Sequence, residues 1–118
     1  MSTWSYRSPE KNSDDLGDVP TFTRLLFEGA VEYKETLDNL LLTPSIIAPC
    51  GAAFLLLWES DIDMWKRLFV SDNYHPSPLG TALIARVIKV AVFGKGRSGG
   101  EGTESDVLWE VAERACGV

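Results

Sequence analysis

Residues 72–80 read DNYHPSPLG, and we expect the rest of the chain to be organised around this stretch. It contains His75, the one histidine of the sequence. An imidazole titrates near neutral pH, so it can take up and return a proton during a reaction. Asp72 lies three residues earlier and can accept a hydrogen bond from the other ring nitrogen, which fixes the tautomer. The spacing predicts Asp72 and His75 as the orienting acid and the general base of a catalytic site.

The residues after the histidine predict the start of a helix. Ser77 is a favoured N-cap, and Pro78 is favoured at the first helical position. Apolar residues then recur at helical spacing as far as Phe93, and Gly94 is typical of the position after a helix ends. The expected buried stripe is Leu79, Leu83, Ile84, Val87, Ile88, Ala91 and Val92. This helix would anchor the loop that carries His75.

The pattern Asp-x-x-His-Pro-Ser-Pro-x-Gly, preceded by Leu68-Phe69 and followed by a helix rich in Ala, Leu and Ile, resembles the last sequence block of the SGNH (GDSL-type) hydrolases. The resemblance covers roughly residues 20–94, with a weaker echo at residues 3–7. It implies that His75 is the catalytic base and Asp72 the acid that orients it. It also implies an α/β fold, the C-terminal part of a three-layer α/β/α (flavodoxin-like) domain, mostly helical here with one or two short strands. The implied activity is that of a serine esterase or acetylesterase.

The nucleophile that the resemblance requires is missing from the sequence. The family places its serine in a Gly-Asp-Ser block after a buried strand, whereas Gly17-Asp18 is followed by Val19 and preceded by a polar run. Ser71 would share a turn with the base, and Ser77 is expected to cap a helix. We therefore expect the chain alone to be inactive and to need the N-terminal half of the hydrolase as a partner. The alternative is a non-catalytic α-rich interaction or packing module.

Four segments are expected along the chain: an irregular N-terminal segment (1–20), the hydrolase-like part (21–94), a flexible linker (95–103) and a C-terminal helix (104–118). That last helix could dock on the core or bind a partner's groove.

Within residues 21–94, three further elements are expected before the histidine loop. An amphipathic, core-facing helix should run from Thr21 and end before Thr43-Pro44. Residues 46–48 form a short apolar run between prolines, which predicts a strand buried on both faces. Residues 52–58 are apolar almost all round, which predicts a helix buried on more than one side and favours self-association. Asp61 should cap a short helix that leads to Asp72.

Composition excludes several other functions. The formal net charge is −6 and no basic stripe is present, so we expect no nucleic-acid partner. Two cysteines suggest neither a disulfide scaffold nor a metal site. Asp61, Asp63, Asp72 and His75 do not have the spacing of a known metal motif, so no metal or cofactor is expected. No stretch predicts a signal peptide or membrane helix, which makes a soluble, cytoplasmic protein the default expectation.

Overall fold

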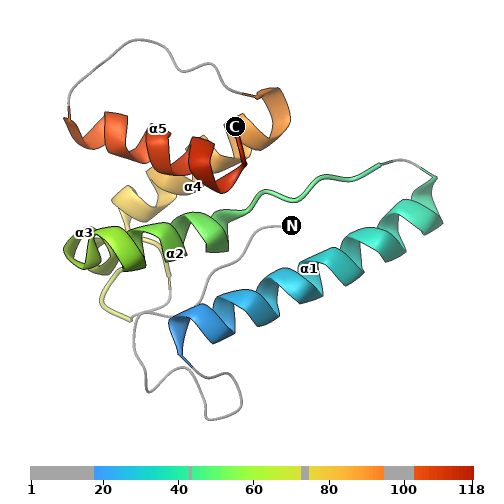
Figure 1. Ribbon diagram of the computed structural model, residues 1–118, viewed down its shortest axis with the longest axis horizontal. Helices are drawn as coiled ribbons and strands as arrows, with labels where there is room; N and C mark the ends of the chain where they lie inside the picture. Colours follow the sequence, from blue (N-terminus) through green and yellow to red (C-terminus); the bar gives the residue numbers. More distant parts are fainter. Residues whose placement is uncertain (1–17, 43, 73–74, 95–102) are drawn as a thin grey trace.

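The computed structural model describes residues 18–42, 44–72, 75–94 and 103–118, and within them the chain forms five helices (Figure 1). They are α1 (Val19–Leu41), α2 (Cys50–Ser60), α3 (Ile62–Arg67), α4 (Pro78–Phe93) and α5 (Thr103–Ala115). These ranges contain no strand, and their β-type pairing is an isolated antiparallel bridge between Phe69 and Pro76. The expected α/β fold with a three-layer architecture is therefore wrong, and the described chain is all-α.

The expected strand at residues 46–48 fails because nothing pairs with it. A strand needs a neighbour that exchanges backbone hydrogen bonds, and the described residues provide none. Ile46 is 53% exposed, which is the opposite of burial on both faces. The segment is tied to α1 instead, because the Ser45 backbone N–H and hydroxyl both donate to Asp38 Oδ1, at 2.6 and 2.7 Å.

Helix α2 is the centre of the structure. It packs against α1, α3, α4 and α5, and its buried side chains leave it in several directions, as expected for an apolar helix. Cys50, Ala53, Phe54 and Leu57 are each at most 1% exposed. The prediction of a helix buried on more than one side is confirmed. The chain covers α2 by itself, so this helix no longer argues for self-association.

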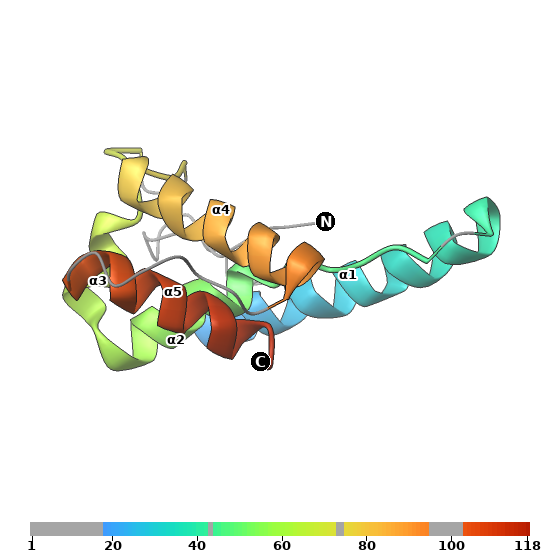
Figure 2. The same cartoon turned by 90° about the horizontal axis from the view of Figure 1, so that it is seen from above.

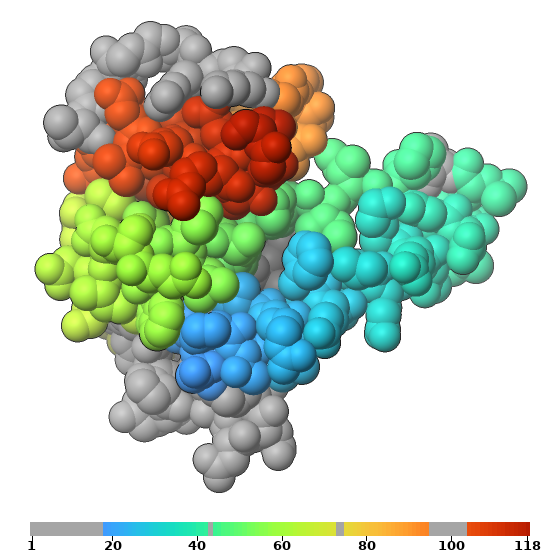
Figure 3. All heavy atoms as spheres, in the orientation of Figure 1, coloured from blue at the N-terminus to red at the C-terminus, as the bar shows by residue number. Residues whose placement is uncertain are grey.

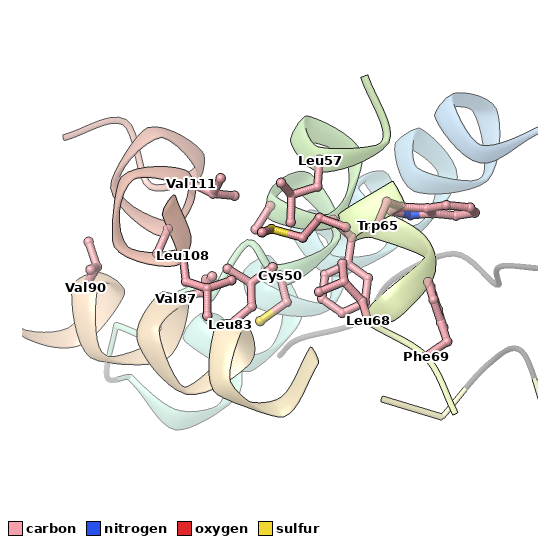
Figure 4. Packing of buried hydrophobic residues seen from close by; sticks show 14 of the residues in the cluster. Cys50, Leu57, Trp65, Leu68, Phe69, Leu83, Val87, Val90, Leu108 and Val111 are labelled. Atoms are coloured by element: carbon pink, nitrogen blue, oxygen red, sulfur yellow. The ribbon is translucent and has the colours of Figure 1, made fainter. Parts of the chain in front are cut away.

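Helix α5 docks on α2 and α4. Of the two alternatives for the C-terminal helix, the structure therefore shows docking on the core. Leu108, Val111 and Ala112 are at most 5% exposed. Figure 4 shows Leu108 and Val111 entering the same packed space as Leu83 and Val87 of α4.

The buried face of α4 is rotated relative to the expected stripe. Leu83, Val87 and Val90 are at most 3% exposed, whereas Ile88 is 43% and Val92 52% exposed. The reason is the docking of α5, which covers the side of α4 that carries Val90. An apolar row consequently remains on the outer side of α4.

Helix α1 is buried in its first half only. Its N-cap is Asp18, whose side chain accepts from the Thr21 N–H at 3.0 Å. Its buried residues are Val19, Phe22, Thr23 and Ala30. Beyond Ala30 the helix and the first returning residues, 44–46, project from the other helices as an arm (Figures 1, 2 and 3). The expectation of a core-facing helix over its whole length is therefore wrong for this second half.

The molecule is flat, with principal extents of 42, 41 and 20 Å. A thickness of 20 Å is about two helix diameters, so most helices have a neighbour on one face and solvent on the other. None of the described helices combines the length and the apolarity needed to cross a membrane.

Candidate active site on the Asp72–His75 loop

Helix α3 supplies the rigid support for the loop that carries His75. The side chain of Asp61 caps its start by accepting from the Met64 N–H at 3.1 Å, as the sequence predicts. Trp65 packs edge-on against Phe69 with ring centroids 5.4 Å apart. Phe69 makes a second edge contact with Phe54 of α2 at 5.6 Å. These contacts fix the chain where it leaves α3.

The two ends of the loop are joined by backbone hydrogen bonds. The Ser77 N–H donates to the Leu68 carbonyl at 2.8 Å, and the Val70 N–H donates to the His75 carbonyl at 2.9 Å. Together with the bridge between Phe69 and Pro76, they hold residues 68–70 and 75–77 side by side. His75 is therefore attached to a short antiparallel stem, and its backbone position follows that stem.

The structure brings Asp72 and His75 into contact. One carboxylate oxygen, Oδ1, accepts from the His75 backbone N–H at 2.9 Å. The other, Oδ2, contacts the ring nitrogen Nδ1. The His75 side chain is 67% exposed and that of Asp72 36% exposed. A single carboxylate thus holds both the backbone and the ring of the histidine at the surface.

This contact has a direct chemical consequence. With a carboxylate against Nδ1, the neutral imidazole keeps its proton on Nδ1 and its lone pair on Nε2. A lone pair on Nε2 is what a general base needs to accept a proton from an attacking hydroxyl group. The carboxylate also stabilises the imidazolium that proton transfer would form.

Of the two serines close to His75 in sequence, Ser77 is not available as a nucleophile. The Ser77 hydroxyl donates to the Arg67 carbonyl at 2.5 Å and accepts from the Gly80 N–H at 3.1 Å, so it is committed to the backbone. Ser71 is exposed in the turn directly before Asp72. The described part of the chain also contains no group of three or more histidine, cysteine or acidic side chains that could hold a metal ion.

Two structural features of the site go beyond the sequence prediction. One is the bond from Ser77 to the Arg67 carbonyl, which adds a second role to the expected cap. The other is Gly80, where an added Cβ would lie 2.1 Å from the Leu68 carbonyl oxygen. The signal for it is a glycine in the first turn of a predicted helix, a place where glycine is otherwise unfavourable.

An apolar groove lies elsewhere, between α1 and the start of α2. Its volume is about 400 Å³. It is lined by one side of α1 between Pro20 and Ala30, by residues 47–52, and by Leu55 and Ala115. None of these lining residues belongs to the stem or the loop that carry His75. The groove therefore lies between the first half of α1 and the start of α2 and is not part of the candidate active site.

The fold places the described chain in the all-α class, and its candidate site is a carboxylate–histidine pair. The sequence matches no protein-family model, and no curated protein and no solved structure matches it either. The resemblance to the SGNH hydrolases and the roles it implies for Asp72 and His75 therefore stay predictions.

Proposed function

We propose that Asp72 and His75 are the orienting acid and the general base of an ester hydrolase, and that another polypeptide segment supplies its nucleophile and oxyanion donors. The observation that carries the proposal is the contact between Asp72 Oδ2 and His75 Nδ1 at an exposed ring. A surface-exposed imidazole with this orientation can reach a hydroxyl group on a neighbouring segment.

The chain alone is expected to be inactive. Acyl transfer needs an activated nucleophile and hydrogen-bond donors that stabilise the oxyanion. Stabilisation of the oxyanion is usually the largest single contribution to the rate enhancement. We expect purified protein to hydrolyse an activated acetyl ester no faster than a His75→Ala variant. A clear rate that depends on His75 would mean that the chain contains its own nucleophile.

Complementation tests the proposal directly. The partner to try is the polypeptide encoded immediately upstream of this one, produced separately and mixed with the purified chain. If the proposal is right, the mixture hydrolyses acyl esters, and His75→Ala lowers the rate by about 10²- to 10⁴-fold, the usual contribution of a general base. Asp72→Asn should lower it as well, because the amide no longer fixes the tautomer. A restored rate that survives His75→Ala would exclude the proposed roles.

A second candidate function is a non-catalytic α-rich packing module that self-associates through α1. The observation that favours it is the exposure of the apolar face of the arm, where Tyr33 is 53%, Leu40 74% and Leu41 63% exposed. These residues continue the helical face that buries Phe22 and Ala30. Two such faces related by a two-fold axis are self-complementary, so a second copy of the chain is the simplest partner that would bury this apolar face.

Sedimentation at increasing concentration separates this second candidate from a monomer. Self-association through the arm should weaken in a Leu40→Glu, Leu41→Glu double variant and be unaffected by His75→Ala. A single monomer species up to millimolar concentration would exclude it.

A further inference from the structure

We infer that Ser77 and Gly80 are positioning residues for His75, because they fix the start of α4 against the end of α3 and so determine where the imidazole is presented. The inference rests on the proposed function, since it assigns the residues that place its general base. The bonds that carry this role join Ser77 to the backbone of residues 67, 68 and 80, so the role is exerted through the backbone.

Ser77 joins two helix ends at once. Its hydroxyl accepts from the Gly80 N–H and thereby caps the start of α4. The same hydroxyl donates to the carbonyl of Arg67, the last residue of α3, and the Ser77 N–H donates to the carbonyl of Leu68. The last carbonyls of a helix have no partner within the helix, so these two bonds satisfy groups that would otherwise need water. Ser77 thereby joins the start of α4 to the end of α3.

Gly80 makes this approach sterically possible. An added Cβ would lie 2.1 Å from the Leu68 carbonyl oxygen, 3.1 Å from its carbonyl carbon and 3.2 Å from Pro76 Cβ. The first two atoms belong to the backbone and cannot rotate away, so a larger residue must push α4 from α3. That displacement would lengthen the Ser77–Leu68 bond, which starts at 2.8 Å.

The effect reaches His75 through one intervening residue. Only Pro76 separates His75 from Ser77, and the His75 carbonyl accepts from the Val70 N–H on the opposite side of the stem. Asp72 and His75 are only three positions apart, so the pair itself can form locally. Ser77 and Gly80 determine the placement of that pair on the molecule.

NMR of the full chain tests this inference, because a single histidine gives a single set of imidazole signals. The two readouts are the His75 ring signals and the exchange rate of the Val70 amide hydrogen, whose bond closes the stem. In Gly80→Ala we expect the ring signals to shift away from their wild-type positions, because the surroundings of the pair change. We also expect Val70 exchange to accelerate by about tenfold or more, as for a locally opened hydrogen bond. Ser77→Ala should act in the same direction, and Ser77→Thr, which keeps the hydroxyl, should restore both readouts.

Two control variants separate positioning from general loss of stability. Gly29→Ala makes the same substitution in α1, where an added Cβ meets nothing within 4 Å, and should leave both readouts unchanged. Val87→Ala removes core packing in α4 without touching the stem, and at temperatures where it stays folded it should keep the wild-type ring signals. If Gly80→Ala does not fold, Ser77→Ala and Ser77→Thr decide alone.

The inference and the proposed function fail in different ways. Wild-type ring signals identical to those of the folded Gly80→Ala variant, with unchanged Val70 exchange, would overturn the inference alone. Wild-type imidazole nitrogen shifts that place the neutral ring's proton on Nε2 would remove the proposed pair, whatever Gly80→Ala does.

Discussion

At the scale of single residues, Asp38 joins the end of α1 to the returning chain. Its carboxylate accepts from Lys34 Nζ at 2.5 Å and from the Ser45 N–H and hydroxyl at 2.6 and 2.7 Å. The hydrogen bond from Lys34 and those from Ser45 lower the pKa of Asp38 from 3.8 to about 2. This one side chain therefore closes the turn that sends the chain back along α1.

The lowered pKa of Asp38 predicts a pH dependence with a definite sign. A carboxyl group with a lower pKa in the folded state adds stability above its unfolded pKa of 3.8, and loses it as the pH falls toward about 2. Asp38→Asn should therefore lower the melting temperature at pH 5 and have less effect at pH 2. Urea or thermal unfolding at both pH values measures this, with Glu35→Gln on the same helix as the charge control. An equal effect of Asp38→Asn at both pH values would contradict the assignment.

Gly29 offers the opposite case, a residue whose replacement should stabilise the protein. It lies inside α1, where an added Cβ meets nothing within 4 Å. Alanine restricts the unfolded chain and favours the helix, so Gly29→Ala should raise the free energy of unfolding by about 0.5–1 kcal/mol. Urea unfolding measures the change. A loss of stability would indicate that another molecule packs closely against this face of α1.

At the scale of elements, apolar burial rather than ion pairing should hold α5 in place. Leu108 is 3% exposed, whereas Arg67 and Glu104 form an ion pair of 3.2 Å at the surface. Leu108→Ala should cost about 2–5 kcal/mol of unfolding free energy because it leaves a cavity. Glu104→Gln should cost at most about 1 kcal/mol because solvent screens the pair. Urea unfolding of both variants compares the contribution of apolar burial with that of the ion pair. A larger loss of unfolding free energy for Glu104→Gln than for Leu108→Ala would contradict this ranking.

The elements that the sequence predicts well are those defined by neighbouring residues. The caps at Asp61 and Ser77 and the end of α4 at Gly94 are confirmed, because each depends on backbone groups within a few positions. Neighbouring residues alone could not show whether residues 46–48 form a strand. An apolar run forms a strand only if another strand lies beside it, and that depends on the rest of the fold.

The candidate site likewise combines features that neighbouring residues determine with features that depend on the rest of the fold. Asp72 and His75 are three positions apart, so sequence spacing was enough to suggest their contact. A glycine in the first turn of a predicted helix marks the position of Gly80, but not its reason, which is the approach of α4 to the Leu68 carbonyl twelve positions away. The rotation of α4 likewise follows from the docking of α5 and not from the periodicity of α4 itself.

At the scale of the whole molecule, stability should be unevenly distributed. The core cluster joins α2, α3, α4 and α5, and Val19 is the part of α1 that enters it. No residue of α1 after Ala30 is buried. Regions with few buried apolar contacts open locally without unfolding the rest of a protein. The arm is thus expected to be the first part of the described chain to lose its structure.

Hydrogen exchange at the level of single amides tests this expectation. Amides in the middle of α2 should exchange only through global unfolding, whereas those of residues 34–41 should exchange through local opening and at least about tenfold faster. Their rates should also respond weakly to urea, because opening the arm exposes little new surface. The measurement is best made at two protein concentrations. Protection of residues 34–41 equal to that of α2 at both would contradict the expectation, while protection that appears only at the higher concentration would identify a second copy as the cover of the arm.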